Sequence, residues 1–153
     1  MQSDLSRFEE RKPGLLTGAV AEIVAGRRLT NWTAALLPQI AGLVQNAGAD
    51  ELGFRSRAEV EDYLLDGRLF RDYGIILEAV RDQLVVAHMH IVDLFGVPDD
   101  RAFIDSVTLV RGVSAHLTGN GFAQMVITCD ELLAEAAAQG YEPNVETLAF
   151  LAA

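Results

Sequence analysis

The sequence predicts an all-α fold: a single globin-like helical domain of about six or seven helices around a long central helix. Apolar residues recur at steps of three or four along most of the chain, and no convincing run of strand alternation appears. The breaks between periodic segments are short, and the segments differ in length, which favours helices crossing at steep angles. An irregular helical bundle is the alternative. A chain of 153 residues is one ordinary domain, so residues 1–153 are expected to share one core.

The longest periodic stretch, residues 69–95, is the predicted central helix. Its apolar residues form one face and then widen into a broad surface, which is typical of a helix covered from several sides. We therefore expect it to be the most buried long helix. The predicted core and pocket-lining residues come mainly from this helix, with one tryptophan from an earlier segment: Trp32, Tyr73, Ile76, Val80, Leu84 and His88.

The first part of the chain predicts two helices after a polar N-terminal segment at residues 1–13. Apolar spacing predicts a helix over residues 15–25, where Gly26 suits a helix C-terminus. The next helix is expected to begin at Thr30 or Asn31, to kink at Pro38 and to stop at residues 46–48.

A short helix follows, opened by the capping box that runs from Ser56 to Glu59 and ending near Gly67. After the central helix, residues 96–100 form the clearest break, because glycine, proline and aspartate there end one helix and cap the next.

The C-terminal part predicts two more helices. The first carries inward-facing apolar residues from Phe103 onward and is interrupted at residues 119–121. The second resumes at Phe122 and ends near Gly140. The apolar tail, residues 141–153, is expected to dock as a last turn or to mark where a longer protein was cut.

Composition excludes several classes of function. The net charge is −10, and the small basic group of Arg27, Arg28, Arg55 and Arg57 is read as a solvated face, so nucleic acid is not an expected partner. No apolar run approaches the roughly 20 residues of a membrane span. The single Cys129 cannot form an internal disulfide and the N-terminus lacks an apolar signal core, so we expect a cytoplasmic protein.

The sequence Ala87-His88-Met89-His90 is the strongest candidate for a ligand site, because histidine ligates metals and haem. On a continuous helix, however, side chains two residues apart diverge by about 200° and cannot share one metal. We therefore expect no metal and no cofactor; if haem is bound, His88 or His90 is the expected ligand. Cys129 is expected to be a buried, inert thiol. No catalytic motif is present, which predicts that the protein is not an enzyme.

His116 has a weak likeness to the phosphorylated histidine of histidine phosphotransfer proteins. In those proteins a lysine and a glycine closely follow the histidine, whereas Thr118 stands here at the lysine position. Phosphotransfer is therefore kept as a further alternative.

Two segments, GRRLTNWTAALLPQI and DYLLDGRLFRDYGIILEAVRDQLV, resemble the N-terminal sensory domains of stressosome co-antagonist proteins and related bacterial sensor kinases. The likeness covers roughly residues 15–137. The family's Leu-x-x-Glu-Tyr-x-x-Leu-Arg segment has its nearest counterpart at Leu69, Asp72, Tyr73, Ile76 and Leu77.

The resemblance implies a non-haem globin fold in a bacterial stress-response protein that dimerises and relays a signal without catalysis. Apolar surface left over after core formation also predicts a homodimer. We therefore expect a non-catalytic signalling or sensory domain that contacts a protein partner. A haem- or small-ligand-binding globin-like sensor is the alternative.

Overall fold

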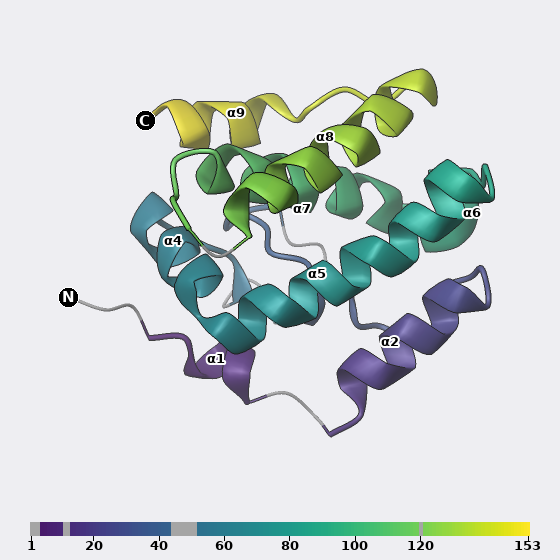
Figure 1. Cartoon of the computed structure of the whole chain (residues 1–153), viewed down its shortest axis with the longest axis horizontal. Coiled ribbons are helices and arrows are strands. Elements are labelled where there is room, and N and C mark those ends of the chain that lie inside the picture. Colours follow the sequence, from purple (N-terminus) through teal and green to yellow (C-terminus); the bar gives the residue numbers. More distant parts are fainter. Residues whose placement is uncertain (1–3, 11–12, 44–51, 120) are drawn as a thin grey trace.

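The computed structural model describes residues 4–10, 13–43, 52–119 and 121–153, which are helical throughout apart from their connections (Figure 1). In these ranges no strand occurs, and one isolated bridge joins Ile40 to Phe54. The all-α prediction is confirmed. The helices are α1 (Ser6–Glu9), α2 (Leu15–Val24), α3 (Thr33–Leu36), α4 (Arg57–Leu65), α5 (Gly67–Arg81), α6 (Ile91–Phe95), α7 (Asp99–Ser114), α8 (Phe122–Ala138) and α9 (Val145–Ala152), with a π-helical segment at Asp82–Val86.

Helix α7 is the most buried long helix. The expectation that residues 69–95 would form the most buried long helix is therefore wrong. Every residue of α7 is buried except Arg101, Arg111 and Gly112. Helix α8 packs along it, and α4, α6 and α9 contact its other sides (Figure 1). Helix α5 instead buries one face and leaves the other to solvent. The chain is therefore organised around α7.

The predicted central helix is also not continuous. After α5 the chain forms the π-helical segment, in which the Ala87 backbone N–H donates to the Asp82 carbonyl at 3.0 Å. His88 then has a φ of 59°, a left-handed conformation that ends the helix. The Gln139 side chain accepts from the Ile91 N–H and donates to the Met89 carbonyl. A distant side chain thus satisfies the interrupted backbone, which local periodicity cannot reveal.

The second predicted helix, kinked at Pro38, is wrong as well. Helix α3 ends at Leu36, and Leu37 is extended because a following proline disfavours helical geometry. The chain then pairs Ile40 with Phe54. The predicted stop at residues 46–48 lies outside the described residues.

Several predicted elements are present. Helix α2 begins at Leu15, and Ser56 caps α4 by accepting from the Glu59 N–H at 3.2 Å. The chain breaks between α7 and α8, and the apolar tail forms α9, which docks on α7 with Leu151 beside Gly112.

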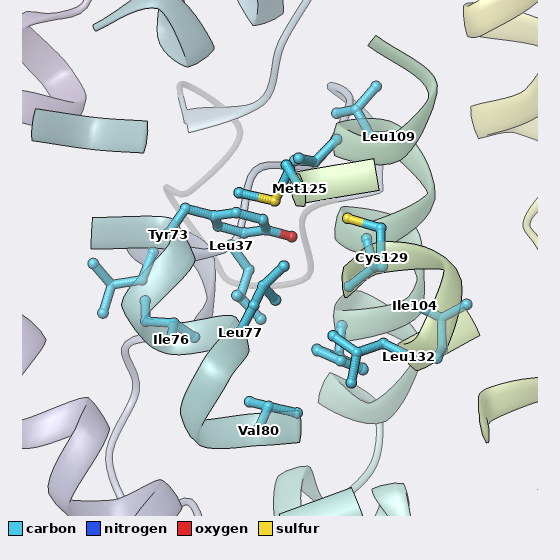
Figure 2. Close-up of a cluster of buried hydrophobic side chains, with 14 of the residues drawn as sticks. Leu37, Tyr73, Ile76, Leu77, Val80, Ile104, Leu109, Met125, Cys129 and Leu132 are labelled. Atoms are coloured by element: carbon cyan, nitrogen blue, oxygen red, sulfur yellow. The ribbon is translucent and has the colours of Figure 1, made fainter. Parts of the chain in front are cut away.

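The main core lies where α5, α7 and α8 meet (Figure 2). There the Tyr73 hydroxyl from α5 pairs with the Ser106 hydroxyl of α7 at 3.0 Å. Cys129 is fully buried, and burial raises the pKa of its thiol to about 12, which leaves it protonated. No helix in the described ranges has the length and apolar character needed to cross a membrane.

Candidate functional site

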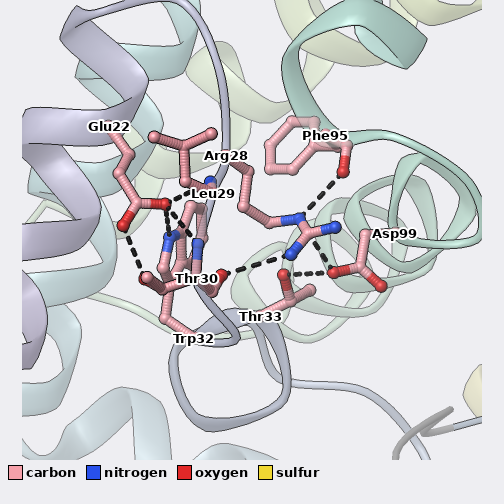
Figure 3. Close-up of polar contacts among 8 residues, drawn as sticks. All are labelled: Glu22, Arg28, Leu29, Thr30, Trp32, Thr33, Phe95 and Asp99. Carbon is pink, nitrogen blue, oxygen red and sulfur yellow. Dashed lines mark hydrogen bonds and ion pairs between the residues drawn. The ribbon is translucent and has the colours of Figure 1, made fainter.

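Glu22, near the end of α2, organises the loop that leads to α3 (Figure 3). Its carboxylate accepts hydrogen bonds from the Leu29 and Thr30 backbone N–H groups, the Thr30 hydroxyl and the Trp32 indole nitrogen. Burial raises the pKa of Glu22, but the hydrogen bonds from Thr30, Leu29 and Trp32 outweigh it and lower the pKa to about 2. The carboxylate is therefore ionised near neutral pH, with both of its oxygens already accepting hydrogen bonds.

Arg28 ties the same loop to the junction of α6 and α7 (Figure 3). Its Nε donates to the Phe95 carbonyl at 2.8 Å and lies 3.1 Å from the Asp99 Oδ2. Thr33 donates its hydroxyl to the same carboxylate oxygen at 2.7 Å. The side chains of Arg28 and Asp99 are only 20% and 10% exposed. This largely buried ion pair therefore holds the loop after α2 against the junction of α6 and α7, two segments far apart in the sequence.

Sequence reasoning read Arg28 as part of a solvated face, and the structure corrects this. Arg27 is exposed, but Arg28 is partly buried against Asp99. The signals present in the sequence were the basic turn after α2 and the aspartate after Pro98. Their separation along the chain gave no reason to pair them.

A second polar group lies around the start of α7. The Tyr141 hydroxyl donates to the Asp100 Oδ2 at 2.8 Å, and Arg101 stacks over the Tyr141 ring at 5.8 Å. Asp105 is buried, which raises the pKa of its carboxyl. Across the part of the chain that is described, no three histidine, cysteine, aspartate or glutamate side chains gather in a way that could hold a metal ion.

His88 and His90 were the ligands expected only if haem were bound. His88 and His90 are both exposed, on the break between the π-helical segment and α6. His88 was predicted to line the core or a pocket, and the left-handed turn places it outside the core. His116 is exposed just after α7. The other predicted core residues, Trp32, Tyr73, Ile76, Val80 and Leu84, are all buried.

An open groove of about 640 Å³ lies beside the connection between α7 and α8, and we call it the α7–α8 groove. Its lining is made of small and apolar residues and contains no charged side chain. Ile127, on its rim, is 54% exposed. The lining residues are Ser114, Ala115, Leu117, Thr118, Gly119, Gly121, Ala123, Val126 and Ile127.

Comparison with known proteins gives a family and a fold relative. The family model described as "Protein of unknown function (DUF1810)" matches residues 2–129. The structure is similar to the crystal structure of the conserved hypothetical protein Rv1873 from Mycobacterium tuberculosis, with 27% sequence identity and a TM-score of 0.75. That likeness covers 98% of this chain and 97% of the other. No curated protein matched the chain. Neither match names a globin or a stressosome protein, so that resemblance stays a prediction.

Proposed function

The chain belongs to the DUF1810 family of proteins of unknown function, and we propose that it is a non-catalytic helical domain that associates with a second copy of itself through the α7–α8 groove. The observation that carries the proposal is an uncharged, open, apolar groove on a chain with a net charge of −10. The expected role as a sensor that relays a signal builds on this association.

Charge favours this surface over the others. Two subunits that each carry an excess of acid repel one another, so they approach at lowest cost where neither presents a charge. The glycine, alanine, serine and threonine residues of the lining allow close backbone approach, and Ile127 supplies a large apolar side chain.

The shape of the groove favours a second copy as its occupant. In a two-fold dimer the same patch meets itself, so a projecting side chain and the hollow that receives it must both belong to that patch. The exposed Ile127 and the groove satisfy this requirement, because Ile127 is part of the groove's own rim.

The charged networks support a contact role over catalysis. The side chains of Glu22, Arg28 and Asp99 make hydrogen bonds and an ion pair that hold the loop between α2 and α3 in place. A general base or nucleophile needs a reactive group within reach of substrate, and these three groups serve the fold instead. We accordingly propose no catalytic residue.

Sedimentation equilibrium over a range of protein and salt concentrations tests the proposal. The mass is expected to rise towards twice the 16.6 kDa of one chain, more readily at raised salt because salt screens the repulsion. Ile127→Glu is expected to keep the fold and remain monomeric, because it places a like charge opposite itself.

Val145→Glu is the matched control, since Val145 is 77% exposed on α9 and outside the groove. It is expected to dimerise like the natural protein. A monomer at several hundred micromolar protein and raised salt would sink the proposal. If the Ile127→Glu variant dimerised as well as the natural protein, the dimer contact could not be the α7–α8 groove.

A further inference from the structure

Helices α5 and α8 run side by side (Figure 1). A second groove is lined by residues of both helices. It consists of two adjoining pockets of about 220 Å³ and 360 Å³, which share Glu78, Gln124 and Thr128. We call it the α5–α8 groove. It has only Gly121 in common with the α7–α8 groove, so the inference drawn from it stands apart from the proposed dimer.

One end of the α5–α8 groove is apolar. Phe70 and Leu77 of α5 and Met125 of α8 line it. Gly74 lies in the middle of α5, where a Cβ atom would meet nothing within 4 Å. Replacing a glycine in a helix by alanine normally stabilises the helix, so no close neighbour requires a glycine here. The glycine leaves an open apolar slot.

The other end of the groove carries an excess of negative charge. Glu78, Asp82 and Glu131 line it together with one cation, Arg81. The Arg81 guanidinium donates its Nε to the Glu131 Oε2 at 3.0 Å, with its Nη2 at 2.9 Å from the same oxygen. Because Arg81 is engaged with Glu131, Glu78 and Asp82 give this end a surplus of acid.

We propose that the α5–α8 groove binds a small organic cation with an apolar body, such as an arylalkyl or alkyl amine. The apolar body lies in the slot beside Gly74, and the ammonium group lies between Glu78 and Asp82. This orientation matches the chemistry of both ends, whereas a carboxylic acid of the same shape would place a negative charge against two carboxylates.

The groove suits a ligand of fragment size. Ligand pockets usually enclose about 300–1,000 Å³, and this groove is open along one side. An open site of this kind is expected to bind such an amine with a Kd of about a millimolar.

A titration followed by two-dimensional amide NMR tests the proposal on the full chain at low salt. The probes are 2-phenylethylamine, the neutral 2-phenylethanol and the anionic 3-phenylpropanoate, which are similar in size. The amine is expected to bind about tenfold more tightly than the alcohol, with shifts concentrated at amides around Gly74, Glu78 and Gly121. Equal binding of the alcohol, tighter binding of the acid, or shifts centred elsewhere would overturn the proposal.

Two substitutions separate the slot from the charge. Gly74→Leu fills the slot and is expected to lower the affinity for the amine at least tenfold. The melting temperature should not fall, because the space around a Cβ there is open. Gly18→Leu is its matched control, since Gly18 lies in α2 with equally open space around a Cβ. It is expected to bind the amine normally.

Glu78→Gln is expected to lower the affinity for the amine by about fivefold and to leave the affinity for the alcohol unchanged. If Gly74→Leu lowers the melting temperature, Gly74→Ala serves in its place, with a smaller loss of affinity. Natural affinity in folded Gly74→Leu, or equal losses for amine and alcohol in Glu78→Gln, would overturn the assignment.

Discussion

Helices α5 and α7 are similar in length but differ in how they meet the rest of the protein. Helix α5 carries a clear stripe of apolar residues and buries that stripe together with Asp72, whereas Ile75 on its other side is 39% exposed. Helix α7 includes Asp99, Ser106 and Thr108, yet all three are buried. The helix with the plainer apolar stripe is therefore the less enclosed one.

Three of the buried polar side chains of α7, Asp99, Ser106 and Thr108, have hydrogen-bond or ion-pair partners. Asp99 meets Arg28 and Thr33, Ser106 meets Tyr73, and Thr108 donates its hydroxyl to the Ile104 carbonyl one turn earlier at 2.8 Å. A buried polar group with a partner avoids most of the cost of leaving water. A mixed sequence can thus form the central helix where its buried polar side chains find partners, either on other elements or, for Thr108, in the preceding turn of α7.

The largest expected effect comes from placing a charge inside α7. Val107 is fully buried, and an unpaired aspartate there costs several kcal/mol against a total stability of roughly 5–15 kcal/mol. We expect Val107→Asp to unfold the protein, as Val80→Asp should on the buried face of α5. Circular dichroism melting measures both.

Ile75→Asp is the control for these two variants, because it lies on the exposed side of α5 and should fold normally. A folded Val107→Asp variant with an unchanged melting temperature would contradict the central position of α7.

The next effect compares an enclosed ion pair with an exposed one. Asp99→Ala leaves Arg28 and Thr33 without their shared acceptor and is expected to cost about 2–3 kcal/mol. Arg81→Ala removes the exposed pair with Glu131 and should cost clearly less, because solvent screens the attraction between two exposed charges. Urea unfolding measures both. Similar losses in the free energy of unfolding for the two variants would show that burial does not make the Arg28–Asp99 pair more stabilising than the Arg81–Glu131 pair.

A smaller effect with opposite signs is expected at two glycines. A Cβ at Gly112 of α7 would lie 2.5 Å from one Leu151 methyl carbon and 2.7 Å from the other, so Gly112→Leu must displace Leu151. It is expected to destabilise by about 1–3 kcal/mol through overpacking. Gly74→Leu on α5 meets no such neighbour and is expected to be neutral or stabilising. Loss of stability in both variants would contradict this contrast.

The smallest effect is a pH dependence that comes from Glu22. Its pKa in the folded protein, about 2, lies below the ordinary value of 4.5. The stabilisation is therefore fully present above about pH 4.5 and is lost as pH falls through about 2. Glu22→Gln should flatten the fall in melting temperature over this window. Equal slopes in Glu22→Gln and the natural protein would argue against the hydrogen bonds assigned to Glu22.

The sequence predicts those parts of the fold that depend on local signals. The capping residue Ser56, the glycine break before α7 and the apolar spacing of α2 are all local, and all three appear in the structure. The break at residues 87–90 depends on Gln139, and the burial of α7 depends on Arg28 and Tyr73. Contacts between distant residues leave no periodic trace.

The candidate sites were predicted less well for the same reason. His88 was predicted to face the core because residues 69–95 were expected to form one continuous helix. Its own left-handed conformation ends the helix and leaves the side chain exposed. The two grooves arise from small residues, Gly74 on α5 and Ala123 on α8, that become informative only when a second helix lies opposite.

The π-helical segment at 82–86 determines the point around the α5 axis at which the chain leaves this helix. A π-helix bonds residue i to i+5 where an α-helix bonds i to i+4, so the segment holds one residue more than an α-helical turn. Deleting one residue there would restore α-helical geometry and move the exit point of the chain by about 100° around the α5 axis. The segment that leads to α6, and to the Phe95 carbonyl that accepts from Arg28, would then start from a displaced position. Gaps among aligned relatives should therefore avoid residues 82–95.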